Sequence, residues 1–283
     1  SRKANLDFQK KIENIEGYNF DKRSKLEVYK ELISKNENTA TETQPYLYLS
    51  REINTIFPLS GLSNSQTLYC NENGYYSIYQ SDRYGFNNPD YEWDKEKIAF
   101  LLLGDSFTQG ACVNRPNDIA SVLRTLSKEG VLNLGYAGNG PLIEYATLVE
   151  YISPNVKNIL WLYYEANDLV NLEAELKSTF LAKYLNDIKF KQNLQSQQNL
   201  VDDLSKSLIV EAMKKENDSS ITIVNKSIFN FFFKYLEYFK LNNLRYLFKS
   251  YSLLKHVEEK NLKNENHFFR IIKLANDLAL RND

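Results

Sequence analysis

The chain has 283 residues, of which 43% are hydrophobic, and its formal net charge is -1. This is enough apolar material for one large domain, or for one domain with an insertion. The near-neutral charge argues against a nucleic-acid partner, and no apolar run reaches the roughly 18 residues that a membrane-spanning helix needs. No signal peptide is present. Because the first residue is Ser1 and not Met, we interpret the chain as trimmed, which leaves room for a leader or an anchor before it.

Residues 1–97 are expected to form a helix and short strands that pack beside a main sheet. Apolar residues at helical spacing predict an amphipathic helix over 22–35, followed by a loop at 36–43. Turn signals and aromatic residues alternate over 46–97, and this pattern favours short strands and irregular chain. A small hairpin is expected after Asn73-Gly74, with Tyr75, Ile78 and Tyr79 in its arm.

A regular alternation of strands and helices begins at residue 98. Continuous apolar runs predict strands at 98–103, 131–134 and 158–164, and helical patterns lie between them at 117–128 and 142–152. In the first helix one face is shared by Ile119, Val122, Leu123 and Leu126. Strands that alternate with helices of this length indicate an α/β core with a parallel sheet, which we assign to residues 98–169.

The pattern after Asp168 is mostly helical and predicts an insertion or cap over 170–283. Apolar residues that step by four predict one long helix at 170–190, and further helices are expected around 201–212, 228–239 and 265–280. Only 221–224 has the composition of a strand. The aromatic cluster at 229–239 is interpreted as core between cap helices, although it could also face a lipid or acyl chain.

Three predicted loops follow the three core strands and carry groups suited to acyl transfer. The first contains Gly104-Asp105-Ser106, the second contains Gly138, and the third contains Asn167-Asp168. Because the carboxyl ends of parallel strands meet at one edge of a sheet, these loops should lie together. A hydroxyl nucleophile, a backbone N–H at a glycine and a side-chain amide are what the tetrahedral intermediate of an ester requires.

These three blocks resemble those of the SGNH/GDSL hydrolases over about residues 98–170. The resemblance implies a flavodoxin-like parallel sheet and an acyl-enzyme formed on Ser106. It also implies an oxyanion hole from the N–H groups of Ser106 and Gly138 and the Asn167 side chain, with Asp105 and Asp168 in support. No metal or cofactor is implied. The stretch 82–89 is similar to bacterial members that act on, or lie near, cell-surface polysaccharides, which slightly favours the cell envelope.

The sequence departs from that family at two points. Glu165 replaces the glycine of the third block, and the Asp-x-x-His block that carries the general base is absent. Neither His256 nor His267 has an Asp three residues before it, and we interpret both as surface or cap residues. We therefore expect that the chain stops before the last one or two strands and the catalytic His, and that it is nearly inactive as it stands; the alternative is a member that has lost its base.

The function expected is that of a serine esterase or deacylase on a small-molecule or glycan ester. A carbohydrate O-acyltransferase that uses the same serine is the first alternative, and a degenerate glycan-binding or interaction module is the second. Cys70 and Cys112 are too few for a disulfide framework or a zinc site. They could pair outside the cytoplasm, but two buried free thiols are the interpretation that we favour slightly.

Overall fold

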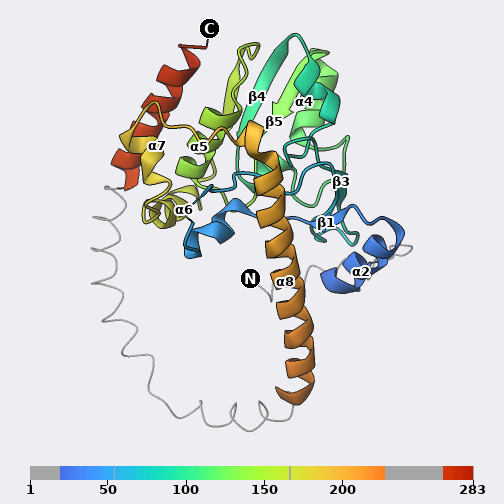
Figure 1. Ribbon diagram of the computed structural model, residues 1–283. Coiled ribbons are helices and arrows are strands. Elements are labelled where there is room, and N and C mark those ends of the chain that lie inside the picture. The colour runs from blue at the N-terminus through green and yellow to red at the C-terminus, as the bar shows by residue number, and fades with distance from the viewer. Residues whose placement is uncertain (1–19, 54, 166, 227–263, 283) are drawn as a thin grey trace, which may run out of the picture.

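The structure is a computed structural model that describes residues 20–53, 55–165, 167–226 and 264–282. The side chains of 216–226 are not described. In Figure 1 the strands lie in the upper part of the molecule, with helices around them, and the long helix α8 (Gln198–Lys226) extends away from this body.

The central sheet consists of three parallel strands, β4 (Ile98–Gly104), β5 (Gly130–Asn133) and β6 (Ile159–Leu162). Their order is β5-β4-β6, so β4 is the middle strand and pairs with both neighbours. A middle strand of a parallel sheet is covered on both faces, which explains why its apolar run is unbroken. The predicted α/β class and its three strands are confirmed, with ends that differ by a few residues.

Helices cover both faces of this sheet. Leu101 and Leu103 of β4 point toward α5 (Pro141–Tyr151), with which they share the main core, whereas Leu102 lies in a second cluster with Ala120 of α4 (Ile119–Ser127). Figure 1 shows α4 on one side of the strands, and α5 with the C-terminal helix on the other. Side chains alternate along a strand, and this alternation distributes β4 between the two layers.

The helix α4 forms where it was predicted, but its expected apolar face is largely exposed. Ile119 and Val122 are exposed, and Leu126 is 74% exposed. Ala120 and Leu123 make the contact with the sheet instead. A short helix beside a three-stranded sheet buries only the side chains that point at the strands, so most of its apolar face has no neighbour within the described residues.

The N-terminal part contains one helix and a second small sheet. The helix α2 (Lys25–Lys35) begins at Ser24, whose side chain and that of Glu27 form a capping box. The strands are β1 (Thr39–Thr41), β2 (Gln66–Leu68) and β3 (Ile78–Gln80), with 3₁₀ turns η1 (Pro45–Ser50) and η2 (Asp90–Asp94).

Two predictions for this part are now decided. The loop expected at 36–43 is wrong, because β1 lies inside it and pairs in parallel with β2. The hairpin is confirmed: β2 and β3 are antiparallel, with Leu68 opposite Ile78. Asn73-Gly74 lies in its connecting loop, and Tyr75 belongs to that loop and not to the arm.

The segment after Asp168 is helical, but the single helix expected at 170–190 is wrong. Two short helices, α6 (Asp168–Glu175) and α7 (Ala182–Asn186), take its place. Apolar residues four positions apart do occur here, but they do not lie on one continuous helix. Leu172, Phe180 and Tyr184 reach the same core from two helices and the turn between them. After η3 (Leu194–Gln197) comes α8, and the strand considered at 221–224 is part of that helix.

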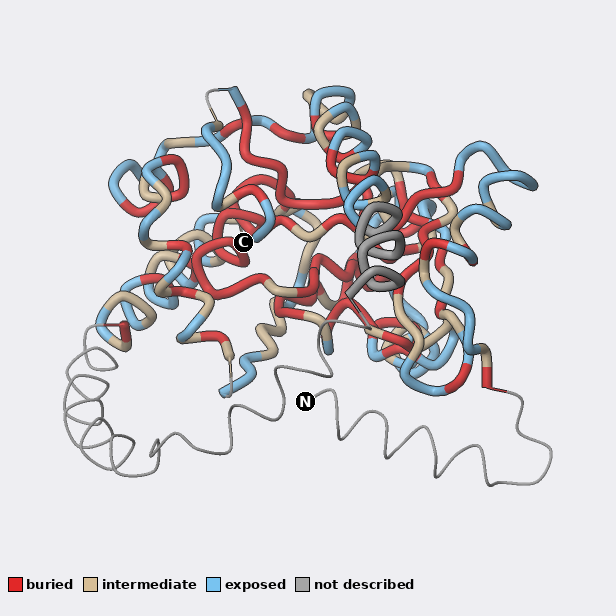
Figure 2. Tube along the Cα trace, turned by 90° about the horizontal axis from the view of Figure 1, so that it is seen from below, coloured by how far each residue is buried: buried red, intermediate tan, exposed pale blue. Residues whose placement is uncertain are grey.

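The last helix, residues 264–279, is close to its predicted position, whereas the helix and aromatic cluster expected around 228–239 lie outside the described residues. One main core joins all three segments of the sequence, from Tyr48 through Leu101 to Ile271. Figure 2 shows these buried stretches gathered in the middle of the molecule. Within the described part of the chain, no helix combines the length and the apolar character that crossing a membrane requires.

Candidate functional site

The first loop brings Ser106 to the carboxyl end of the middle strand. Gly104 has φ +148, and a Cβ on it would lie 2.2 Å from Thr108 Oγ1, so the sharp turn after β4 requires glycine here. The carboxylate of Asp105 accepts a hydrogen bond of 3.0 Å from the N–H of Phe107 and caps the short helix α3 (Ser106–Gln109). Ser106 is half-buried, and its hydroxyl has no hydrogen-bond partner among the described residues.

The second loop presents Gly138 in a conformation that other residues rarely adopt. Its φ is +76, and a Cβ would lie 2.3 Å from Cδ1 of the Tyr46 ring. The Tyr46 ring therefore rests on the backbone of Gly138, and it is 39% exposed. Both the positive φ and this close approach require glycine.

The third loop is joined to the first by a side-chain contact. Asn167 stands at the N-terminus of α6, and its Nδ2 donates to Asp105 Oδ2 at 3.3 Å. Asp168 accepts a hydrogen bond of 2.6 Å from the N–H of Tyr164, which closes the turn that carries Asn167. Burial raises the pKa of Asp168 to about 6. Glu165, in place of the expected glycine, is exposed.

One pocket of about 490 Å³ brings the three predicted groups together. Ser106, Gly138 and Asn167 all line it, although they come from three loops. Asp105 and Asp168 do not line it and are buried behind it. The remaining lining residues are Gln44, Tyr46, Leu49, Tyr69, Cys70, Glu72, Ala111, Ala137, Asn171, Ala174 and Glu175.

Hydrogen-bond donors suited to an oxyanion are free at this pocket. Within the described residues, the backbone N–H groups of Ser106 and Gly138 have no acceptor. The Asn167 amide carries two N–H bonds, and only one contact, to Asp105, is formed. The pocket can therefore present up to three donors to a developing negative charge, which is the arrangement that stabilises a tetrahedral intermediate.

Acidic and amide side chains line the pocket. None of the described residues that line it is Lys or Arg. Glu175 lies at its base and accepts hydrogen bonds from the N–H groups of Gly140 and Leu142 at 2.6 and 2.9 Å. Burial raises the pKa of Glu175 to about 7, although these donors act in the opposite direction. Among the described lining residues, no side chain carries a positive charge that could pair with an anionic ligand.

A buried polar network under the site was not predicted from the sequence. Asp82 accepts hydrogen bonds from the Asn88 amide and from Trp93 Nε1, at 2.9 and 2.7 Å. Asn88 also pairs with both backbone groups of Asn133, at the end of β5, and the Asn133 amide donates to Thr108 O. The stretch 82–89 thus acts as a buried support that joins the first loop to the second.

Gln109 is the second part of this support. It is fully buried, and its Oε1 accepts hydrogen bonds from Tyr69 OH at 2.7 Å and from the N–H of Ala137 at 2.8 Å. Asn87 holds the backbone of Gln109 through a bond of 2.9 Å. Because Ala137 precedes Gly138, Gln109 fixes the second loop relative to the helix that begins at Ser106. The Asn side chains within 82–89 were the one sign of this support in the sequence. Their hydrogen-bond partners could not be predicted, because these depend on the tertiary fold.

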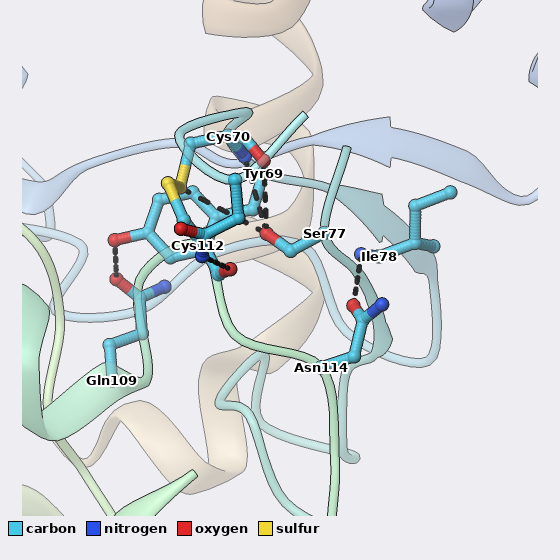
Figure 3. Close-up of a disulfide and its surroundings, with 8 residues drawn as sticks. Tyr69, Cys70, Ser77, Ile78, Gln109, Cys112 and Asn114 are labelled. Atoms are coloured by element: carbon cyan, nitrogen blue, oxygen red, sulfur yellow. Dashed lines mark hydrogen bonds between the residues drawn. A yellow bond between two sulfur atoms is a disulfide. The ribbon is translucent and has the colours of Figure 1, made fainter. Parts of the chain in front are cut away.

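Cys70 and Cys112 form a disulfide, so the slight preference for free thiols is wrong (Figure 3). Their Cα atoms are 5.0 Å apart, although 42 residues separate them in the sequence. The bond joins the β2–β3 loop to the segment after α3, and Figure 3 shows the contact of Tyr69 with Gln109 beside it. Because Cys70 and Ala111 line the pocket, the disulfide fixes one of its walls.

His267 does not belong to the described site. His267 is half-buried on the C-terminal helix and does not line the pocket, and His256 lies outside the described residues. Within the described ranges, no group of three or more His, Cys, Asp or Glu side chains is placed to hold a metal ion.

Comparisons with protein-family models, with curated protein sequences and with solved structures found no match to this chain.

Proposed function

We propose that this protein is a serine ester hydrolase of the SGNH/GDSL type, which acts through an acyl-enzyme on Ser106. The observation that carries the proposal is the single pocket lined by Ser106, Gly138 and Asn167. These residues are 32 and 29 positions apart in the sequence, as their numbers give (138 − 106 and 167 − 138). Chance seldom places a nucleophile and such donors around one cavity.

The proposed fold is a flavodoxin-like sheet. The order β5-β4-β6, with helices on both faces, matches the first three strands of that arrangement, which is 2-1-3. In such a sheet the second strand is added on one side of the first and the third strand on the other, so the strand order reverses between the first and third strands, and ligands bind in the crevice at that point. Ser106 follows β4 and Asn167 follows β6, so the proposed nucleophile and amide flank this crevice.

The reaction begins when Ser106 Oγ attacks the carbonyl carbon of the ester. As the new C–O bond forms, an electron pair of the carbonyl moves onto the carbonyl oxygen. The N–H groups of Ser106 and Gly138 and the Asn167 amide donate hydrogen bonds to the oxyanion that results. Collapse of the tetrahedral intermediate breaks the bond to the alcohol oxygen, which takes up a proton as it leaves, and an acyl-serine remains. Water then attacks the acyl carbon, the C–Oγ bond breaks, and the acid and the Ser106 hydroxyl are released. Asp105 acts by positioning Asn167, and Asp168 acts by closing the turn before it.

The Ser106 proton requires an acceptor in the first step. Among the described residues that line the pocket there is no histidine, and the carboxylates that line it are those of Glu72 and Glu175. When a member of the catalytic triad is missing, oxyanion donors and substrate binding still accelerate hydrolysis by about 10³–10⁴-fold over the reaction in water. We therefore expect slow hydrolysis from this chain, well above the uncatalysed rate but far below that of a complete triad.

Ester hydrolysis by matched variants tests the proposal. With 4-nitrophenyl acetate, Asn167→Ala should lower the rate by about 10²–10³ because one oxyanion donor is lost, and Ser106→Ala should abolish the acetyl-enzyme that mass spectrometry detects on the wild type. Ser50→Ala is the control, since Ser50 is exposed and lies outside the pocket. Absence of an acetyl-enzyme on the wild type, or its equal formation on Ser106→Ala, would remove the hydrolase proposal.

A second candidate function is a binding module with a degenerate site. The absence of a histidine from the described pocket lining favours it. Such a module would bind an ester or a glycan but would form no acyl-enzyme, so a covalent serine probe separates the two functions.

A further inference from the structure

One face of α6 carries a row of polar side chains that line the pocket. Asn167, Asn171 and Glu175 are four positions apart, so they lie along one side of the helix that follows Asn167. All three line the same pocket as Ser106. The proposed chemistry uses Asn167 as an oxyanion donor, but it gives no role to the other two side chains.

The carboxylate of Glu175 caps the first turn of α5. Its Oε1 accepts a hydrogen bond from the N–H of Gly140 at 2.6 Å, and its Oε2 accepts from Leu142 and Ile143 at 2.9 and 3.3 Å. Pro141, between these donors, has no N–H to satisfy. Gly140 is the N-cap residue and has no side chain that could cap the helix. We call these three bonds the Glu175 cap, and they place its carboxylate at the positive end of α5.

The helix α6 also lies directly against the second loop. A Cβ on Gly140 would lie 2.7 Å from Cβ of Asn171 and 2.9 Å from the backbone N of Leu172, so glycine is what allows this close approach. The Nδ2 of Asn171 donates to the carbonyl oxygen of Asn139 at 3.4 Å. Because Asn139 follows Gly138 directly, these contacts fix the position of α6 relative to the Gly138 N–H.

The two ends of α6 are held differently. At its beginning, the contact between Asn167 and Asp105 is 3.3 Å long, which is above the usual range for a hydrogen bond from nitrogen to oxygen. At its end, the Glu175 cap supplies three bonds to α5. The second loop is held separately, because Gln109 accepts from the N–H of Ala137. Loss of the Glu175 cap should therefore leave the second loop in place but release α6 together with Asn167.

We propose that Glu175 is a positioning residue for the reaction at Ser106. It holds α6 against the second loop, and it thereby sets the Asn167 amide at the spacing from the Gly138 N–H that an oxyanion requires. This inference deepens the proposed function and rests on it. A proton taken from Ser106 would compete with the three N–H donors for the carboxylate of Glu175, so Glu175 acts through Asn167 and not as the proton acceptor.

Hydrogen exchange of the full chain measures the Glu175 cap without catalysis. Glu175→Gln keeps the size of the side chain, but it turns one acceptor into an NH₂ group that faces N–H donors. Amide exchange over 140–143 and 167–175 should become at least tenfold faster, while β4 should be unchanged. Glu173→Gln is the matched control on the same helix, because Glu173 pairs with Lys177 and does not line the pocket. It should leave exchange over 140–143 unchanged.

Acetylation of Ser106 by 4-nitrophenyl acetate at pH 8 measures the consequence for the site. Burial raises the pKa of Glu175 to about 7, so its carboxylate is charged at this pH. Peptide mass spectrometry follows the acetyl-enzyme, with Ser106→Ala as the blank. Glu175→Gln should slow acetylation at least fivefold in the otherwise wild-type chain. In a chain that carries Asn167→Ala it should slow acetylation less than twofold, because the amide that Glu175 positions is already absent.

A second variant keeps the test decisive if Glu175→Gln does not fold, which circular dichroism checks. Asn171→Ala then takes its place in both measurements, since Asn171 is only half-buried and makes the neighbouring contact to Asn139. It should slow acetylation at least twofold, and again only when Asn167 is present.

Three results would overturn the positioning role. The first is unchanged exchange over 140–143 in Glu175→Gln. The second is a slowing of acetylation smaller than stated. The third is an equal slowing with and without Asn167→Ala, which is the behaviour of a proton acceptor. If the wild type forms no acetyl-enzyme at all, the hydrolase proposal fails and the positioning role falls with it, whereas faster exchange in Glu175→Gln would still establish the Glu175 cap.

Discussion

Replacing Cys70 and Cys112 with serine removes the covalent link between the β2–β3 loop and the segment after α3. The two residues are 42 apart, and the entropy that a crosslink removes from the unfolded chain grows with the logarithm of that number. For a loop of this size the loss is about 13 cal/mol/K, or about 4 kcal/mol at 25 °C. The double variant should therefore lose about 4 kcal/mol of unfolding free energy.

The assay is urea unfolding followed by circular dichroism, with and without dithiothreitol. Reduction should lower the unfolding free energy of the wild type by as much as the two substitutions do. The unfolding free energy of the double variant should be the same with and without dithiothreitol. Because Cys70 and Ala111 line the pocket, ester hydrolysis should fall in the double variant even at temperatures where it stays folded. Ser77→Ala is the matched control, since it removes hydrogen bonds from the same loop but keeps the crosslink.

Two results would refute this reasoning. One is alkylation of both cysteines by iodoacetamide in the native, unreduced protein, which would mean that no disulfide exists. The other is a change in unfolding free energy below about 1 kcal/mol in the double variant, which would mean that the loop is held by its other contacts.

Three further predictions concern the second loop, the buried support and the buried acids. Gly138→Ala should lower the free energy of unfolding by about 1–2 kcal/mol because of the positive φ, and by more because the new methyl group clashes with Tyr46. Adding Tyr46→Ala should remove the clash and restore that part of the stability in urea unfolding, but the loss from the positive φ should remain. Asn88→Ala should cost about 2–4 kcal/mol by the same measurement, because its amide joins Asp82 to Asn133; a loss under 1 kcal/mol would exclude this support role. Thermal unfolding should occur at a higher temperature at pH 5 than at pH 8. Burial raises the pKa of five acids, so the folded chain keeps protons that the unfolded chain releases between about pH 4 and 7, and stability falls as the pH rises through that window. A melting temperature that rises from pH 5 to pH 8 would contradict this. The acids are Glu42, Asp82, Glu144, Asp168 and Glu175.

The core strands could be predicted because their signal is local. An unbroken apolar run that ends at Gly104 is typical of a strand buried on both faces, and the structure has β4 there. The three loops could be placed at one edge because parallel strands share a direction. That Ser106, Gly138 and Asn167 would line one pocket followed from this topology, although their chemical roles stay predictions.

The features that the sequence did not predict depend on distant partners. Cys70 meets Cys112 only because the β2–β3 loop packs on the segment after α3. The strand β1 has three residues and forms only because β2 lies beside it. The break between α6 and α7 left the spacing of four intact, so periodicity alone predicted one helix. In each case the local pattern was satisfied by more than one structure, and tertiary packing selected among them.

The most direct measurement is the site of covalent modification by a fluorophosphonate probe. The serine oxygen attacks the phosphorus of the probe and displaces fluoride, while the oxyanion donors bind the phosphonyl oxygen, and peptide mass spectrometry locates the adduct. If residues 106, 138 and 167 form a working acyl-transfer site, Ser106 should be labelled far faster than the exposed Ser50, and Asn167→Ala should slow that labelling. Labelling of Ser106 no faster than Ser50 would contradict the account.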